Sequence, residues 1–205
     1  WAKGSQLVRV TPRFNPAVNG YWMCDIGRFQ YGWVEGADRL RKPQLRTKDG
    51  AQQPATWKDA LTKVRDLLNA AGRRDPASVR FLVSAHASLE ELFLVKRVAT
   101  ELKGDAGPAH VAVTWRRSAK SQPANTKFVI PATDAPNVTG ARDLGLGVGA
   151  GLDGTPDLSG LRAAVEAGMV EVLYVAECAG LVIIWFGDRV CSRQEISSSQ
   201  RVAVH

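Results

Sequence analysis

The spacing of apolar residues in the middle of the chain predicts two amphipathic helices. Thr56 is a helix-capping residue, and the apolar stripe that follows it stops at Gly72, which predicts a C-cap there. Ser88 and Glu91 form a capping-box pair before a second stripe, which Gly104 ends. The predicted inward faces hold Trp57, Ala60, Leu61, Val64, Leu67, Leu68 and Ala71 in the first helix and Leu89, Leu92, Phe93, Lys96, Ala99 and Leu102 in the second.

Short apolar runs alternate with these helices and predict strands. The predicted strands are 6–11, 79–85, 110–115, 127–131, 170–175 and 181–186, and a third, shorter helix is predicted over 158–167. Glycines and prolines predict a loop-rich region over 12–55 and a long loop over 132–156. Strands that alternate with amphipathic helices indicate an α/β fold with a largely parallel sheet.

Composition places the chain among ordinary globular proteins. Its 205 residues are 45% hydrophobic and 23% charged, which excludes collagen-like, coiled-coil and wholly disordered chains. The longest apolar run, Ala179 to Phe186, is too short to span a bilayer. Cys24, Cys178 and Cys191 are dispersed and odd in number, which favours a reducing compartment. The chain opens at Trp1 without a start methionine or a signal segment, so we expect a fragment or a processed piece.

Positive charge is concentrated near the start of the chain. The net charge is +7, and residues 1–50 hold nine Lys and Arg against four Asp and Glu. Such a segment can contact nucleic acid, an anionic membrane or an acidic protein. No DNA- or RNA-binding signature accompanies it, so we expect a solvated docking surface and no nucleic-acid partner.

Three motifs could carry chemistry, and each also has a structural interpretation. Residues 149–154 match the glycine spacing of a dinucleotide loop, but no strand leads into them, so a surface loop is expected. His86 follows a predicted strand without neighbouring metal ligands, which favours a turn residue. Cys24 lies among glycines near Arg28 and could ligate iron, yet a cluster needs about four thiolates and the three cysteines have no familiar cluster spacing. No catalytic residue is predicted.

Three consecutive segments resemble one stretch of the molybdopterin oxidoreductase superfamily. Residues 9–19 read Arg-Val-Thr-Pro-Arg-Phe-Asn-Pro-Ala-Val-Asn, residues 22–31 read Trp-Met-Cys-Asp-Ile-Gly-Arg-Phe-Gln-Tyr, and residues 38–43 read Asp-Arg-Leu-Arg-Lys-Pro. This form looks most like the large iron–sulfur subunits of bacterial NADH-quinone oxidoreductase, which is respiratory complex I. Residues 88–91, 135–146 and 168–175 are also similar to that family's pattern.

The resemblance implies a fold, a cofactor and two site residues. Residues 1–50 would be the C-terminal part of a 4Fe-4S domain, and residues 51–205 a partial α/β molybdopterin-oxidoreductase-like domain. Cys24 would be one thiolate ligand of a [4Fe–4S] cluster, with no molybdenum expected. Arg28 would lie near the cluster and raise its potential, or form an ion pair with Asp25 or Asp38.

The resemblance also implies where the chain works. The chain would carry electrons on the path from NADH toward quinone, beside other subunits of the peripheral arm. It would lie on the cytoplasmic side of the bacterial inner membrane and reach the membrane only through those subunits. Alone, the chain is expected to be inactive.

Two departures keep other functions open. The family's first three cluster cysteines should lie upstream of Trp1, so Cys24 is a ligand only if a longer chain supplies them. After Val175 the sequence no longer follows the family pattern. The alternatives are a molybdopterin-dependent enzyme such as a formate dehydrogenase, or a basic binding module without redox chemistry.

Overall fold

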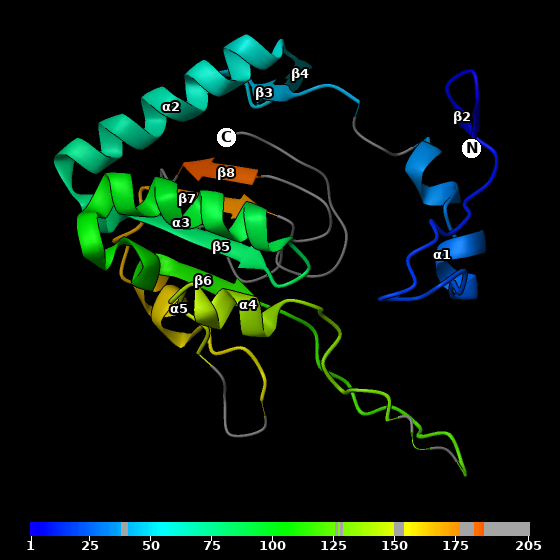
Figure 1. The fold of residues 1–205 in the computed structure, drawn as a ribbon. Coiled ribbons are helices and arrows are strands. Elements are labelled where there is room, and N and C mark those ends of the chain that lie inside the picture. Colours follow the sequence, from blue (N-terminus) through cyan, green and yellow to red (C-terminus); the bar gives the residue numbers. More distant parts are fainter. Residues whose placement is uncertain (38–40, 126, 128, 150–153, 177–182, 187–205) are drawn as a thin grey trace. The chain divides into compact units, whose positions relative to one another are not determined.

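The computed structural model describes residues 1–37, 41–125, 127, 129–149, 154–176 and 183–186 (Figure 1). The chain divides into two compact units, an N-terminal unit (Trp1–Arg41) and an α/β unit (Lys42–His205). The predicted identities of the two domains, with their boundary at residue 50, stay predictions.

The N-terminal unit contains only short elements. Strands β1 (Ala2–Lys3) and β2 (Gln6–Leu7) form an antiparallel hairpin, followed by helix α1 (Asp25–Phe29) and the 3₁₀ turn η1 (Gly32–Glu35). The strand predicted over 6–11 is therefore wrong beyond Leu7. Past that residue the backbone closes onto Trp1, whose carbonyl accepts the Val8 amide at 3.0 Å, and no further ladder forms.

The α/β unit opens with a small hairpin and then builds its sheet. Its elements are β3 (Gln44–Arg46), β4 (Gln52–Pro54), α2 (Trp57–Arg74), η2 (Pro76–Ser78), β5 (Val79–Ser84), α3 (Leu89–Lys103), η3 (Gly104–His110), β6 (Val111–Thr114), α4 (Val138–Asp143), α5 (Ser159–Glu166), β7 (Val172–Ala176) and β8 (Ile183–Phe186). The sheet order is β6-β5-β7-β8, with the first three strands parallel and β8 antiparallel to β7. The predicted α/β fold with a largely parallel sheet is confirmed.

Strand β5 organises the core of this unit. Its side chains alternate, so that Val79, Phe81 and Val83 are fully buried. They belong to one apolar cluster with Leu68 of α2 and Leu92 of α3. Strand β5 lies between β6 and β7, and helices α2 and α3 cover the face on which these three residues lie. A strand in this position needs apolar side chains on its covered face.

The two long helices begin where the sequence predicts. The Thr56 hydroxyl accepts the Asp59 amide at 3.1 Å, and Ser88 and Glu91 form both hydrogen bonds of the capping box. Gly104 ends α3 with a positive φ of 61°. The predicted C-cap at Gly72 is wrong, because α2 continues to Arg74.

Pro76 sets the true end of α2. A residue before proline avoids the helical region, and Asp75 is extended with φ −149° and ψ 106°. Asp75 also caps η2, since its carboxylate accepts the Ala77 amide at 2.8 Å. Pro76 therefore determines the C-terminal end of α2, which lies beyond the end that Gly72 predicted.

Parts of the predicted inward faces are exposed. The buried side of α3 follows Leu92, Val95, Ala99 and Leu102, while Leu89 and Phe93 each remain 47% exposed. On α2, Trp57 and Leu61 are exposed, and the core contacts come from Val64, Leu68 and Ala71. The apolar stripe of each helix is wider than the part that packs on the core. The apolar spacing therefore predicted where the helices lie, but it predicted more buried residues than the structure has.

The fourth predicted strand does not form among the described residues of 127–131. The Gln122 side chain instead takes both backbone groups of Ile130, accepting its amide at 2.9 Å and donating to its carbonyl at 3.0 Å. A side chain thus replaces the ladder that a neighbouring strand would provide. The last predicted strand is confirmed from Ile183, and residues 181–182 lie outside the described residues.

Helix α4 interrupts the loop predicted over 132–156, and Asn137 fixes its start. The Asn137 amide donates to the Ala85 carbonyl, and its side-chain Nδ2 donates to the Ala87 carbonyl, both at 3.1 Å. Ala141, one turn later, is fully buried. These tertiary contacts make a helix of a segment too short to show helical periodicity.

Gly140 leaves the space that the Asn137 side chain occupies. A Cβ at residue 140 would lie 2.1 Å from Asn137 Oδ1 and 3.0 Å from Leu89 Cδ1. Any larger residue must therefore displace the asparagine from the Ala87 carbonyl. Asn137 and Gly140 act as one packing unit that attaches α4 to the turn between β5 and α3.

We predict that Gly140→Ala lowers the free energy of unfolding by about 1–3 kcal/mol, because overpacking breaks the Asn137 anchor. The same change should cost less in an Asn137→Ala background, since the displaced side chain is already gone. Urea denaturation of the four chains measures this coupling. Gly160→Ala is the control, because nothing lies within 4 Å of its Cβ position. Additive effects of the two substitutions would contradict a shared packing unit.

Candidate functional site

Cys24 caps the N-terminus of α1 with its sulfur. Its backbone is extended, with φ −69° and ψ 151°, and Sγ accepts the Gly27 amide at 3.4 Å. The side chain is exposed and free of any disulfide. The predicted loop thiol is thus held in one place by the first turn of a helix while its sulfur stays accessible to a metal or a reagent.

The approach to Cys24 is shaped by a turn. The Asn15 and Gly20 backbones exchange hydrogen bonds of 3.1 and 2.7 Å, and Gly20 has a positive φ of 55°. Asn19 then holds Trp22, accepting its amide at 2.8 Å and donating a side-chain hydrogen bond to its carbonyl at 3.0 Å. These local bonds direct the chain into α1 with Cys24 at its N-cap.

Arg28 lies in the last turn of α1 and is partly buried. It makes no ion pair with Asp25 in the part of the chain that the structure describes. Asp38, the other partner considered for it, lies outside the described residues, as do Arg39 and Leu40 of the Asp-Arg-Leu motif. The role predicted for Arg28 near a cofactor remains a prediction.

Many large apolar side chains of the N-terminal unit are exposed. No described residue of the N-terminal unit is buried. Trp22 is 74% exposed and Trp33 67%, and further exposed apolar residues are Trp1, Phe14, Val18, Tyr21, Ile26 and Phe29. Exposed apolar side chains in this number favour contact with another surface.

The described residues supply one thiol toward a cluster. They contain no group of three or more His, Cys, Asp or Glu side chains that could hold a metal ion. Cys178 and Cys191 lie outside the described residues. The chemistry of Cys24 fits one ligand of an iron–sulfur cluster, since its sulfur is accessible and already receives an N–H hydrogen bond of the kind that tunes such clusters.

The sequence also offered His86 and the glycine-rich segment 149–154 as candidates. His86 is exposed in the turn between β5 and α3, where its amide donates to Ser84 Oγ at 3.2 Å, so the predicted turn residue is confirmed. Of the glycine-rich segment 149–154, residues 150–153 lie outside the described residues.

No described helix is long and apolar enough to cross a membrane.

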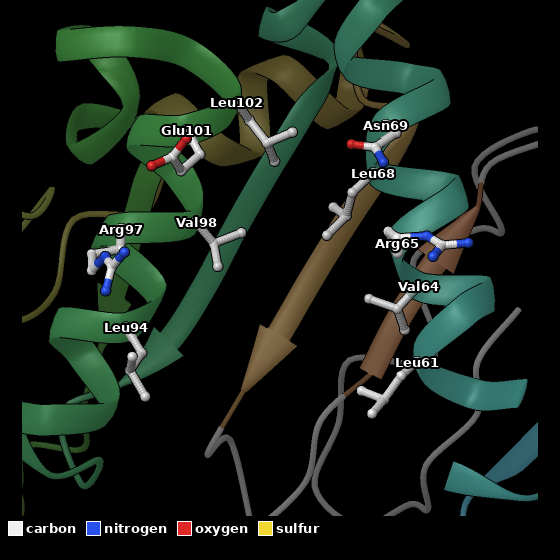
Figure 2. Close-up of a pocket in the computed structure, with 10 residues that line it drawn as sticks. All are labelled: Leu61, Val64, Arg65, Leu68, Asn69, Leu94, Arg97, Val98, Glu101 and Leu102. Carbon is white, nitrogen blue, oxygen red and sulfur yellow. The ribbon is translucent and has the colours of Figure 1, made fainter. Parts of the chain in front are cut away.

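An apolar groove of about 450 Å³ separates α2 from α3 (Figure 2). Its apolar lining consists of Leu61, Val64 and Leu68 from α2 and Leu94, Val98 and Leu102 from α3. Arg65, Arg97 and Glu101 are the charged residues that line it, and neither cysteine nor histidine lines it. The groove therefore offers a packing surface rather than a set of reacting groups.

Three nitrogen-bearing side chains lie where the parallel strands begin. Arg80 is the second residue of β5, His110 directly precedes β6, and Lys103 ends α3. Burial, and then the charge of Arg80, lower the pKa of Lys103 to about 8, while Asp75 opposes that shift. The sequence does not reveal this group, because its three members are far apart along the chain. An arginine inside the apolar strand 79–85 is the feature that could have indicated it.

Comparison with known proteins connects the chain to respiratory oxidoreductases. No family model matches it. It is 34% identical over 101 residues to a subunit of the NADH-quinone oxidoreductase of Thermus thermophilus and 40% identical over 94 residues to a subunit of the same enzyme of Shewanella oneidensis. A Staphylococcus aureus protein, provisionally named a formate dehydrogenase, is 29% identical over 105 residues.

The matches cover part of each relative. They span 49%, 45% and 51% of this chain, but only 12%, 10% and 11% of the respective relatives. The predicted resemblance to a subunit of NADH-quinone oxidoreductase is confirmed, as is the relation to subunits of oxidoreductase enzymes. The activity of the whole relatives comes to this chain only as a proposal.

We predict that stability rises with pH above about 8 because of Lys103. The unfolded amine keeps its proton up to its ordinary pKa of 10.5, whereas the folded amine loses it near 8. Between these values the unfolded state binds more protons, so raising the pH favours the folded state. Urea denaturation at about pH 7.5, 8.5 and 9.5 should show a rise that Lys103→Met removes and that the exposed-site control Lys58→Met retains. An identical pH profile in Lys103→Met would contradict the assignment.

Proposed function

We propose that the chain is an electron-transfer part of an NADH-quinone oxidoreductase, with Cys24 as one thiolate ligand of a [4Fe–4S] cluster. When bound, the cluster supplies one-electron transfer. The observation that carries the proposal is the accessible Cys24 sulfur at the start of α1, in a segment that resembles the cluster-binding element of this family. The similarity to the Thermus thermophilus and Shewanella oneidensis subunits supports the same assignment.

In this proposal the chain's own residues fix the ligand. The helix cap holds Cys24 in an extended conformation, and the Gly27 amide donates to its sulfur. Hydrogen bonds to cluster sulfurs and nearby positive charge both favour the reduced form, so Gly27 and Arg28 would raise the reduction potential. The remaining ligands would come from outside residues 1–205.

The two units have different tasks in this proposal. Residues 1–50 are the C-terminal part of the iron–sulfur domain, and residues 51–205 are a partial α/β domain kept as structure, without molybdenum. The exposed aromatic residues around Cys24 would contact other parts of the assembly, because none of them has a core in the N-terminal unit. The partners are other subunits of the peripheral arm, on the cytoplasmic side of the bacterial inner membrane.

A molybdopterin-dependent enzyme is the second candidate, and the similarity to the Staphylococcus aureus relative favours it. Such an enzyme would share the iron–sulfur segment but would also need a pterin site and a metal ligand. The described residues show no group of metal-ligating side chains for it. The two candidate functions therefore differ in substrate: NADH and quinone for the first, and a substrate such as formate for the second.

We predict that Cys24→Ser removes or alters one cluster signal. Serine is a good N-cap, so its hydroxyl can still accept the Gly27 amide and the fold of α1 is retained. The protein is isolated as its native gene encodes it, and iron content and the electron paramagnetic resonance spectrum of the reduced form are measured. Cys178→Ser is the matched control and should leave both unchanged. Unchanged iron and spectrum in Cys24→Ser would show that Cys24 is only a structural thiol.

We predict NADH-dependent reduction of a quinone analogue by the assembled native protein, and no oxidation of formate. Both reactions are followed by absorbance with the same preparation. Activity in the quinone assay then shows that the preparation is intact, so that an absence of formate oxidation is meaningful. Formate oxidation that depends on molybdenum would replace the first candidate by the second. NADH oxidation that is unaffected by removal of this chain would reject the first candidate.

A further inference from the structure

Three buried nitrogen atoms at the beginning of the parallel strands lack a hydrogen-bond partner among the described residues. They are Arg80 Nε, Lys103 Nζ and His110 Nδ1. A buried polar group without a partner is costly, and a satisfied native state supplies one from the protein, from water or from a bound ligand. Three such atoms in one region form a set of nitrogen atoms that one bound group can satisfy together.

The carboxylates nearby are engaged by backbone amides. Asp75 accepts the Ala77 amide at 2.8 Å, and Asp157 accepts the Ser159 amide at 2.9 Å. Neither carboxylate forms an ion pair with the cations in the described part of the chain. The Asp75 charge still acts on Arg80 and Lys103, but no acceptor among the described residues forms a hydrogen bond with the three nitrogen atoms.

A pocket of about 390 Å³ lies beside these donors. Arg80 and His110 line it, together with Asp157 and the glycines Gly147, Gly149 and Gly160. Lys103 does not line the pocket but is close enough to Arg80 for the two charges to interact. We call this the basic pocket.

The walls of the basic pocket favour an anionic group. Helix α5 begins at one wall, where the Asp157 carboxylate, and not the N-cap residue Leu158, accepts the first amide of the helix. Arg80 is the cation that lines the pocket. Glycine lines the pocket at three positions, so backbone rather than side chains forms much of the wall, as in sites where phosphate approaches the main chain.

We propose that the basic pocket binds a phosphate group, either as free phosphate or carried on a small molecule. Phosphate offers several acceptor oxygens to guanidinium, imidazole and backbone donors, which matches the shortage of acceptors here. The Asp157 carboxylate stays on the Ser159 amide and limits how much negative charge the pocket accepts. This inference concerns the opposite end of the strands from His86 and is independent of the role of Cys24.

The glycines of the pocket provide the measurement. In ¹H–¹⁵N spectra of the intact chain, addition of inorganic phosphate should shift the amides of Gly147, Gly149 and Gly160 in a saturable way. Gly4 and Gly50, which do not line the pocket, should not move. Sodium chloride at equal ionic strength separates binding from screening.

Substitutions then test which side chains hold the phosphate. Arg80→Gln and His110→Asn should each weaken binding about tenfold or more, the effect expected of a charge-assisted hydrogen bond. Arg97→Gln is the matched control, because Arg97 is exposed and lines the α2–α3 groove instead. Removing Arg80 removes a partly buried charge, and His110→Asn provides an independent reading should the first variant fold poorly.

The outcomes separate the sources of phosphate and decide the proposal. Tighter binding of glycerol 3-phosphate than of inorganic phosphate supports a ligand that carries phosphate on an organic group, and equal or weaker binding supports the free ion. No saturable shift with either probe overturns the proposal. Shifts that match those in sodium chloride, or that persist with unchanged affinity in both pocket variants, show an adventitious ion only and overturn it too.

Discussion

The burial of Val79, Phe81 and Val83 beneath α2 and α3 is the interaction on which the α/β unit depends. These three residues make β5 the central strand, and β6 and β7 pair with it in parallel. Alternation along the same strand sends Arg80 to the other face, where the basic pocket forms. The apolar side chains of β5 thus fix the sheet, both long helices and the position of the partly buried Arg80.

The N-terminal unit has no comparable constraint. Its described residues form turns, a capped helix of five residues and a tilted contact between the rings of Phe14 and Tyr21, whose centroids are 4.5 Å apart. Local hydrogen bonds can define such a conformation, but without buried side chains they contribute little net stability in water. Its exposed aromatic residues gain free energy only when another surface or a cofactor domain covers them.

The sequence predicted most where one local rule decides the structure. Helix caps at Thr56 and Ser88, the stop at Gly104 and the apolar strand that begins at Val79 all follow from such rules. It failed where distant residues decide: Asn137 makes a helix by reaching Ala87, and Gln122 takes the backbone groups that a strand at Ile130 would need. Cys24 was found through its surrounding motif, whereas Arg80, Lys103 and His110 become a group only through the fold.

The motifs that carried the family resemblance turn out to differ in kind. In the segment around Asn137, the asparagine ties α4 to the β5–α3 turn, Gly140 leaves room for it, and Ala141 is fully buried. Packing alone explains each of those residues, so their presence reports a shared fold and needs no cofactor. The segment around Cys24 is different, because its thiol caps α1 but is exposed, as are Trp22 and Phe29, so that burial in a core does not explain these residues. The similarity in the α/β unit therefore argues for ancestry, and the argument for electron transfer rests on the short segment around one cysteine.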